Sequence, residues 1–158
     1  MMTSLLRLSA LAALLLTGCA TSHAQTTAPT KAATEFAGAV ADKAEYKVVY
    51  QLDSNDPKLI SQTLHNMLNA LEDPRLKGKL QMELVAFSGG TDVYLKTQPY
   101  EADLQALRQK GVLLAQCLNS MKKRNLSKED LFPFVSYVPT GNGELIIRQA
   151  QGWAIVHP

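Results

Sequence analysis

Histidine and cysteine are scarce in this sequence, which has three histidines and two cysteines. The histidines, His23, His65 and His157, lack the spacing of metal ligands, and there is no His-Glu-x-x-His motif, so we expect no metal site. The sequence also lacks a Gly-x-Gly-x-x-Gly motif, a P-loop and a Gly-x-Ser-x-Gly motif. Nothing therefore indicates a dinucleotide site, a nucleotide site or a serine hydrolase, and we expect no cofactor.

A strong charge of either sign is lacking as well, because the formal net charge of the whole chain is only +2. A nearly neutral chain has no electrostatic footprint for nucleic acid, which we therefore exclude as a partner. Most basic residues are scattered, and one cluster stands out at Lys122, Lys123 and Arg124. Beyond the N-terminal segment, no apolar run is long enough to cross a membrane.

The N-terminus has the layout of a secretory signal. Arg7 supplies a positive charge, and Leu8–Leu16 is apolar apart from one serine, although it is too short to span a bilayer as a stable helix. The segment Leu16-Thr17-Gly18-Cys19 follows, and it resembles the lipobox of bacterial lipoproteins. The resemblance implies that residues 1–18 are a signal peptide, cleaved before Cys19. Its removal leaves a formal charge of about +1.

Lipid attached to Cys19 would anchor the chain stably to a membrane, because several acyl chains act together. The residue after it is Ala20 rather than aspartate, which by the usual sorting pattern of bacterial lipoproteins implies the outer membrane, facing the periplasm. An ordinary secretory signal with an incidental cysteine is the alternative. With Cys19 taken by lipid, Cys117 has no intramolecular disulfide partner in an oxidising compartment, so it is either buried and inert or a reactive thiol.

Composition divides the rest of the chain into a tether and one domain. Residues 19–44 begin with the lipidated cysteine and are rich in alanine and threonine, with few large apolar residues, which predicts a flexible tether. Residues 32–43 are a candidate short helix within it. Residues 45–158 have the size of a single domain.

Apolar periodicity predicts the elements of that domain. Runs of β-branched, aromatic and alternating apolar residues predict strands at 46–52, 79–87, 112–115, 134–138 and 153–156. Helices are predicted at 57–72, 101–110, 119–125 and 143–150, with one further turn capped by Ser127. Asp56 is a good N-cap, and Pro57 suits the first helical position. Strands that alternate with helices predict an α/β fold with a mainly parallel sheet.

Cys117 follows the apolar run 112–115 and precedes a predicted helix. In open parallel sheets, ligands bind outside the carboxyl ends of the strands, and a helix N-terminus favours a thiolate. Free cysteine is also among the most buried residue types. Position alone therefore leaves a reactive thiol and an inert core thiol both open.

Residues 46–158 resemble the DsrE/DsrF-like family of small sulfur-handling proteins. The resemblance is carried by the segment Gly111-Val112-Leu113-Leu114-Ala115-Gln116-Cys117-Leu118-Asn119-Ser120, by the pair Asn66 and Asn69, and by the closing segment 143–158. It implies a flavodoxin-like five-stranded sheet with helices on both faces, a homo-oligomer, and a strand-end cysteine that carries persulfide sulfur. Cys117 matches that cysteine, and Asn119 belongs to the same motif. The sulfur donor and acceptor are not identified by the sequence.

The flavodoxin order of strands brings further residues to this cysteine. In that order the first and third strands are neighbours, so the loop after the first strand lies beside Cys117. Ser54 and Asn55 would then donate hydrogen bonds to a bound sulfur species, while Asp53 would oppose a thiolate. Gly89 and Gly90 either present backbone amides to an anion or form a plain turn. We expect the Cys117 thiol to be partly exposed, with a modestly lowered pKa.

The sequence therefore predicts a periplasm-facing lipoprotein with one DsrE-like domain. The predicted role is that of a carrier, more than an enzyme with turnover of its own: the Cys117 thiolate takes sulfane sulfur, holds it as a persulfide and passes it to a partner thiol. The alternative is a non-catalytic binding or scaffolding module in which Cys117 is structural. Accessibility of the thiol in the folded protein distinguishes the two hypotheses.

Overall fold

The computed structural model describes residues 35–158. The predicted signal peptide, the predicted lipidation site Cys19 and most of the predicted tether lie outside these residues. Residues 35–43 form no helix, so the candidate helix at 32–43 is wrong in the part that the structure describes. Residues 38–158 form one compact unit.

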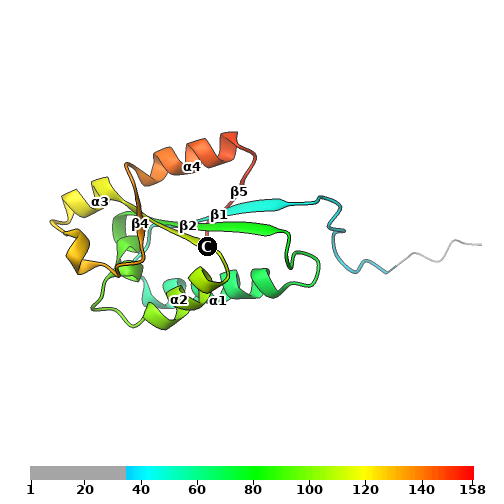
Figure 1. The fold of residues 1–158 in the computed structure, drawn as a ribbon, viewed down its shortest axis with the longest axis horizontal. Coiled ribbons are helices and arrows are strands. Elements are labelled where there is room, and N and C mark those ends of the chain that lie inside the picture. The colour runs from blue at the N-terminus through cyan, green and yellow to red at the C-terminus, as the bar shows by residue number, and fades with distance from the viewer. Residues whose placement is uncertain (1–34) are drawn as a thin grey trace, which may run out of the picture. The chain divides into compact units, whose positions relative to one another are not determined.

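This unit is a parallel five-stranded sheet with helices on both faces (Figure 1). Its elements are, in chain order, β1 (Tyr46–Leu52), α1 (Pro57–Glu72), β2 (Leu80–Ala86), the 3-10 helix η1 (Ser88–Tyr94), α2 (Glu101–Gln109), β3 (Leu113–Cys117), α3 (Leu118–Lys123), the 3-10 helix η2 (Lys128–Asp130), β4 (Ser136–Val138), α4 (Gly141–Ala150) and β5 (Ala154–Val156). The predicted α/β class and the parallel sheet are confirmed.

Alternation along the strands creates two cores, one on each face of the sheet. On the α1 and α2 face, strand residues such as Leu84 and Leu114 pack with Leu64 and Leu104 from the helices. On the opposite face, a smaller cluster is covered by α4; it comprises Val49, Val85, Ala115, Leu145 and Trp153. Figure 1 shows α1 and α2 below the sheet and α4 above it.

A buried ion pair also holds α4 to the sheet. Glu83 of β2 is only 2% exposed, and its carboxylate lies 2.6 Å from Nε of Arg148. Arg148 also pairs with Glu144 at 2.9 Å, and its guanidinium lies 4.3 Å from the centre of the Trp153 ring. Burial raises the pKa of Glu83, partly offset by the charge of Arg148, while Glu144 raises it further. A buried carboxylate without a partner lowers the stability of the fold, so this ion pair favours the packing of α4 against the sheet.

The helix starts follow from capping chemistry. Asp56 accepts a hydrogen bond from the backbone N–H of Lys58 at 2.9 Å, and Pro57 occupies the first turn of α1, as predicted. Thr140 caps α4 by accepting from the N–H of Gly143 at 2.9 Å. The Thr140 cap sets the direction in which the N-terminal amides of α4 point.

The order of the strands differs from the prediction. It is β4-β3-β2-β1-β5, so β2 separates β1 from β3, and the expected neighbourhood of the first and third strands is wrong. Residues 88–94 form the 3-10 helix η1 instead of a plain turn. A continuous apolar run such as 112–115 is typical of a strand buried on both faces, but here one face is partly open, because Leu113 is 49% exposed.

Candidate functional site

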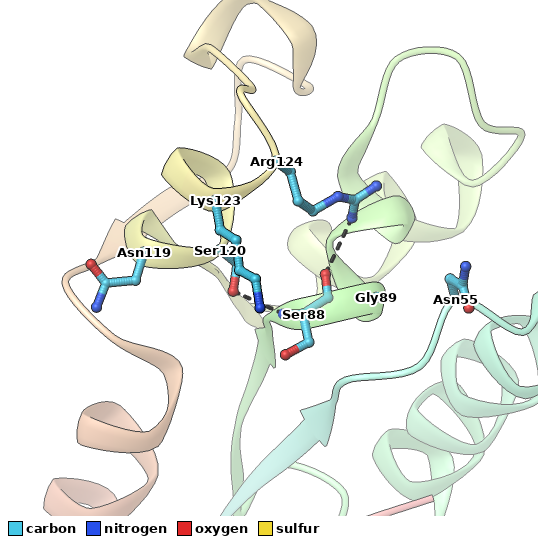
Figure 2. A pocket seen from close by; sticks show the side chains of 7 residues that line it. All are labelled: Asn55, Ser88, Gly89, Asn119, Ser120, Lys123 and Arg124. Carbon is cyan, nitrogen blue, oxygen red and sulfur yellow. Dashed lines mark hydrogen bonds between the residues drawn. The ribbon is translucent and has the colours of Figure 1, made fainter.

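A pocket of about 540 Å³ opens at the carboxyl ends of the central strands (Figure 2). Its wall consists of Asn55, Ser88, Gly89, Asn119, Ser120, Lys123 and Arg124. These residues come from the segments that follow β1, β2 and β3, which end at the same edge of the sheet because the strands are parallel. The pocket therefore occupies the edge where ligands of open α/β sheets bind.

Cys117 lies directly behind this wall. It is the last residue of β3 and the N-cap of α3, and its Sγ accepts a hydrogen bond from the backbone N–H of Ser120 at 3.4 Å. Its side chain faces the α4 side of the sheet, as does that of Ala115 two residues earlier. The residue is only 4% exposed, so the expected partial exposure of the thiol is wrong. Ser120 both contacts the sulfur and lines the pocket, whereas Cys117 is not part of the pocket wall.

Several donors surround the sulfur and shift its ionisation. Burial raises the pKa of the Cys117 thiol, but hydrogen bonds from the Ser120 hydroxyl and from the backbone N–H groups of Ser120, Gly141 and Asn119 together lower it below the ordinary value. Gly141 is the first residue of α4, so this helix contributes an N-terminal amide to the thiolate. The expected direction of the pKa shift is confirmed.

Ser88 orients the Ser120 hydroxyl. The backbone N–H of Ser88 donates to Oγ of Ser120 at 2.8 Å, the contact drawn beside the pocket in Figure 2. Because Oγ accepts from Ser88, its own proton is free to point at the Cys117 sulfur. Ser88 has a φ of 50°, a left-handed conformation that is unfavourable for residues other than glycine. Backbone strain of this kind is found at functional sites, where surrounding contacts hold it in place.

Two cations lie on the outer wall of the pocket. Arg124 forms a salt bridge with Asp92, and its Nη1 donates to the backbone carbonyl of Ser88 at 3.2 Å. Lys123 forms no ion pair within residues 35–158. No acidic side chain is part of the wall. The pocket therefore presents hydrogen-bonding groups and a net positive charge.

The residues predicted to bind a ligand divide between the pocket and its surroundings. Asn55, Gly89 and Asn119 line the pocket. Ser54 does not line it, and its Oγ accepts a hydrogen bond from the backbone N–H of Asp56 at 3.1 Å. Gly90 is buried, and a Cβ atom there would lie 2.0 Å from the carbonyl oxygen of Leu52. Ligand binding by these residues stays a prediction.

The expected opposition of Asp53 to the thiolate is not found. β2 lies between β1 and β3, and the carboxylate of Asp53 contacts Nε2 of His157 at 3.2 Å. His157 follows β5, which pairs with the other side of β1. Asp53 is thus directed away from Cys117, and it is not among the groups that shift the pKa of the thiol.

Sequence reasoning missed Ser120 and Gly141, which donate to the sulfur, and Ser88, which donates to the Ser120 hydroxyl. Ser120 carried a signal, since a hydroxyl three residues after an N-cap lies in the first helical turn. Gly141 carried none, because its approach to Cys117 depends on the tertiary position of α4. Lys123 and Arg124 were noted as a basic cluster, but their place on a pocket wall follows from the fold alone.

Within residues 35–158, no group of three histidine, cysteine or acidic side chains is arranged to hold a metal ion. Across that range, no helix combines the length and the apolarity needed to cross a membrane.

Comparison with known proteins identifies relatives of this architecture. The model of the DsrE/DsrF-like family matches residues 19–158. A protein of unknown function from Methanobacterium thermoautotrophicum, MTH1491, is 29% identical; the match covers 72% of this chain and 100% of that one, with a TM-score of 0.68. A conserved protein of unknown function from Bacteroides thetaiotaomicron, BT1422, is 14% identical over 71% of this chain and 94% of its own, with a TM-score of 0.55, and shares the fold. None of the curated proteins matches this sequence.

Proposed function

Because the chain belongs to the DsrE/DsrF-like family, we propose that its domain binds or relays sulfane sulfur as a persulfide on Cys117. The observation that carries this proposal is the environment of the sulfur. Four hydrogen bonds, from three residues, lower the pKa of a thiol whose burial alone would raise it. The thiolate is the nucleophilic form of cysteine, so these donors favour the reactive state.

The proposed chemistry is two successive transfers of one sulfur atom. The Cys117 thiolate attacks the outer sulfur of a donor R–S–SH, the S–S bond of the donor breaks, and R–S⁻ leaves with the electron pair. Cys117 then carries –S–SH. An acceptor thiolate attacks this outer sulfur, and the Cys117 thiolate leaves. No external oxidant or reductant is needed, because the sulfane sulfur is transferred without a change in its oxidation state.

Burial of the thiol favours a second candidate function, a non-catalytic binding or scaffolding module in which Cys117 is structural. The residue is 4% exposed, and unreactive cysteines are typically buried. For the carrier function, side chains near the pocket floor have to move to admit a donor. Ser120 and Asn119 are the residues that line the pocket beside the sulfur.

Thiol labelling combined with sulfur loading tests the proposal. The full chain is treated under native conditions with iodoacetamide, and separately with a persulfide donor, and each product is analysed by intact mass spectrometry. We expect labelling, and the gain of one sulfur atom, on Cys117 in the native protein. Cys117→Ser abolishes both at this position while leaving the far-UV circular dichroism unchanged. A thiol that reacts only after denaturation contradicts the carrier function and supports the structural one.

The anchor and the assembly are part of the same proposal. The lipobox-like segment ending at Cys19 supports a lipoprotein at the periplasmic face of the outer membrane. Large apolar side chains on the α4 side of the sheet support a homo-oligomer, since Ile146 is 68% exposed and Ile147 54%. Leu113, at the start of β3, adds an exposed apolar side chain to the same face of the sheet.

A further inference from the structure

The walls of the pocket beside Cys117 indicate the kind of molecule that it accommodates. Its two basic side chains differ in availability, since Arg124 is paired with Asp92, whereas Lys123 has no ion-pair partner within residues 35–158. With no carboxylate among the lining residues, the Lys123 ammonium is a charge that an anion can neutralise. The charge of the pocket therefore complements an anion.

The remaining wall is polar and uncharged. Asn55 and Asn119 contribute side-chain amides, and Ser88 and Ser120 contribute hydroxyl groups. Such groups hydrogen-bond carboxylate and amide oxygens. The volume, about 540 Å³, falls within the range of roughly 300–1,000 Å³ typical of sites for small organic ligands. Charge, lining and volume together match a small polar anion.

We propose that this pocket binds a small anionic sulfane-sulfur donor, with Lys123 holding its negatively charged group and Ser120 lying next to its sulfur. This inference rests on the sulfur-carrier function proposed above and names the class of donor. The pocket volume favours an organic persulfide that carries carboxylates, of the size of a short peptide thiol. Thiosulfate shares the same chemistry, since it also combines an anionic group with a sulfane sulfur.

Both donors give a balanced transfer. From an organic persulfide, the Cys117 thiolate takes the outer sulfur together with its proton, and the organic thiolate leaves. From thiosulfate, the thiolate takes the sulfane sulfur and sulfite leaves with the electron pair, so Cys117 carries –S–S⁻. In each reaction the leaving group stays anionic and remains in contact with Lys123 until it is released.

Binding is measured with a probe that has no sulfane sulfur. S-methylglutathione is titrated into the full chain in detergent, and backbone amide shifts are followed by NMR. We expect the shifts to centre on the pocket residues and the affinity to fall with added salt. Lys123→Met should weaken binding about two- to fivefold, the effect of one exposed charge contact. The matched control is Lys122→Met, which removes an exposed lysine of α3 outside the pocket wall and should leave the affinity unchanged.

Equal weakening of binding by the two lysine variants, or NMR shifts centred elsewhere, overturns the pocket assignment.

Loading of Cys117 is then measured with glutathione persulfide and with thiosulfate. We expect Lys123→Met, but not Lys122→Met, to slow loading by the same factor, and the faster donor identifies the source. Loading only by a persulfide on another protein overturns this inference and leaves the carrier function intact. If S-methylglutathione binds but no donor loads Cys117, the carrier function fails and the anion site stands.

Discussion

At the scale of single residues, Ser120 connects the pocket to the buried sulfur. Its hydroxyl accepts from the N–H of Ser88 and donates to Cys117, and its own N–H also faces the sulfur. Removing the hydroxyl leaves the backbone donors in place but takes away one charge-stabilising contact. Ser120 therefore tunes the thiolate and forms part of the barrier that a donor has to pass.

We expect Ser120→Ala to raise the pKa of the Cys117 thiol, because the thiolate loses a hydrogen bond that its neutral form needs less. At neutral pH the thiolate fraction falls, so alkylation that is limited by ionisation should slow by about three- to tenfold. The measurement is the iodoacetamide labelling rate as a function of pH. Ser54→Ala is the control, since Ser54 lies outside the pocket wall. A faster reaction in Ser120→Ala would mean that access, and not ionisation, limits the rate.

The lowered pKa of Cys117 also predicts how stability depends on pH. A group that ionises more easily in the folded state stabilises the fold once it is ionised, so this contribution is complete above the pKa of the unfolded thiol. It is lost as the pH falls through the lower pKa of the folded thiol. As the pH rises from neutral to alkaline, the free energy of unfolding of the wild type, measured with urea, should therefore increase relative to that of Cys117→Ser. A constant difference would show that the pKa is the same in both states.

Gly90 occupies a position where only glycine fits. A Cβ atom would meet the backbone carbonyl of Leu52 at 2.0 Å, so Gly90→Ala should force η1 away from the end of β1. We expect a loss of about 1–3 kcal/mol in the free energy of unfolding, measured with urea. At Gly89 the corresponding contact, with the backbone nitrogen of Asn55, is 2.9 Å. Gly89→Ala should therefore lower the free energy of unfolding by less than Gly90→Ala does. Equal losses in the two variants would contradict the steric explanation.

Residue types indicated part of this site in advance. Cys117 was identified by its place at the end of a strand, and Asn55, Gly89 and Asn119 do lie on one pocket wall. The contact of Ser88 with the Ser120 hydroxyl and the donation by Gly141 could not be found, because they depend on a left-handed backbone at Ser88 and on the packing of α4. Exposure of the thiol was misjudged because a strand-end position does not reveal what packs over it.

At the scale of elements, the attachment of α4 depends on the ion pair between Glu83 and Arg148. This pair matters to the site, since α4 brings the Gly141 amide to Cys117. Removing only the cation leaves a buried carboxylate without a partner. This destabilises the fold more than replacing both members of the pair with neutral groups.

Arg148→Met should lower the free energy of unfolding by about 3 kcal/mol, because Glu83 is left buried without its cation. The pKa of Glu83, already raised by burial, should rise further, so the folded variant takes up a proton more readily than the unfolded chain. The loss of unfolding free energy in Arg148→Met, relative to the wild type, should therefore be smaller near about pH 5 than near about pH 8. Urea unfolding at both pH values measures this. The double variant Glu83→Gln with Arg148→Met should recover much of the loss, and no recovery would assign the effect to lost packing on Trp153.

The elements were largely predictable, whereas their order in the sheet was not. Each strand and helix predicted within residues 45–158 has a counterpart in the structure, because periodicity reports which residues face a core. Periodicity does not report on which side of β1 the next strand pairs. That choice depends on contacts distant in sequence, such as the seven-residue register between β1 and β2 and the placement of β5 on the opposite side of β1.

The anchor and the assembly involve the chain as a whole. We expect Cys19→Ser to block processing or to release the chain from membranes, because the lipid has no other attachment point. Membrane fractionation of cells that express the wild type and the variant checks this, with Cys117→Ser as a control that should remain in the membrane fraction. Unchanged membrane association of Cys19→Ser would contradict the lipoprotein assignment.

Residues 44–158 should form a homo-oligomer through the α4 side of the sheet, where Ile146 and Ile147 are exposed. Closed symmetry is the usual form of such assemblies. Light scattering at micromolar concentration should give more than the monomer mass, and Ile146→Lys should reduce it. The control Ala102→Lys changes an exposed residue of α2, on the opposite face of the sheet, and should leave the mass unchanged. A monomer at this concentration in the wild type would exclude the assembly.

The two outer strands of the sheet have a consequence for aggregation. β4 and β5 contain three residues each, whereas β1 and β2 contain seven. Pro139 directly follows β4, and Pro158 lies two residues beyond β5. Short edges bordered by proline offer few free N–H groups to a strand from another molecule, so they are poor templates for amyloid-like growth. The folded domain can thus reach high local concentrations without extending its sheet from one molecule to the next.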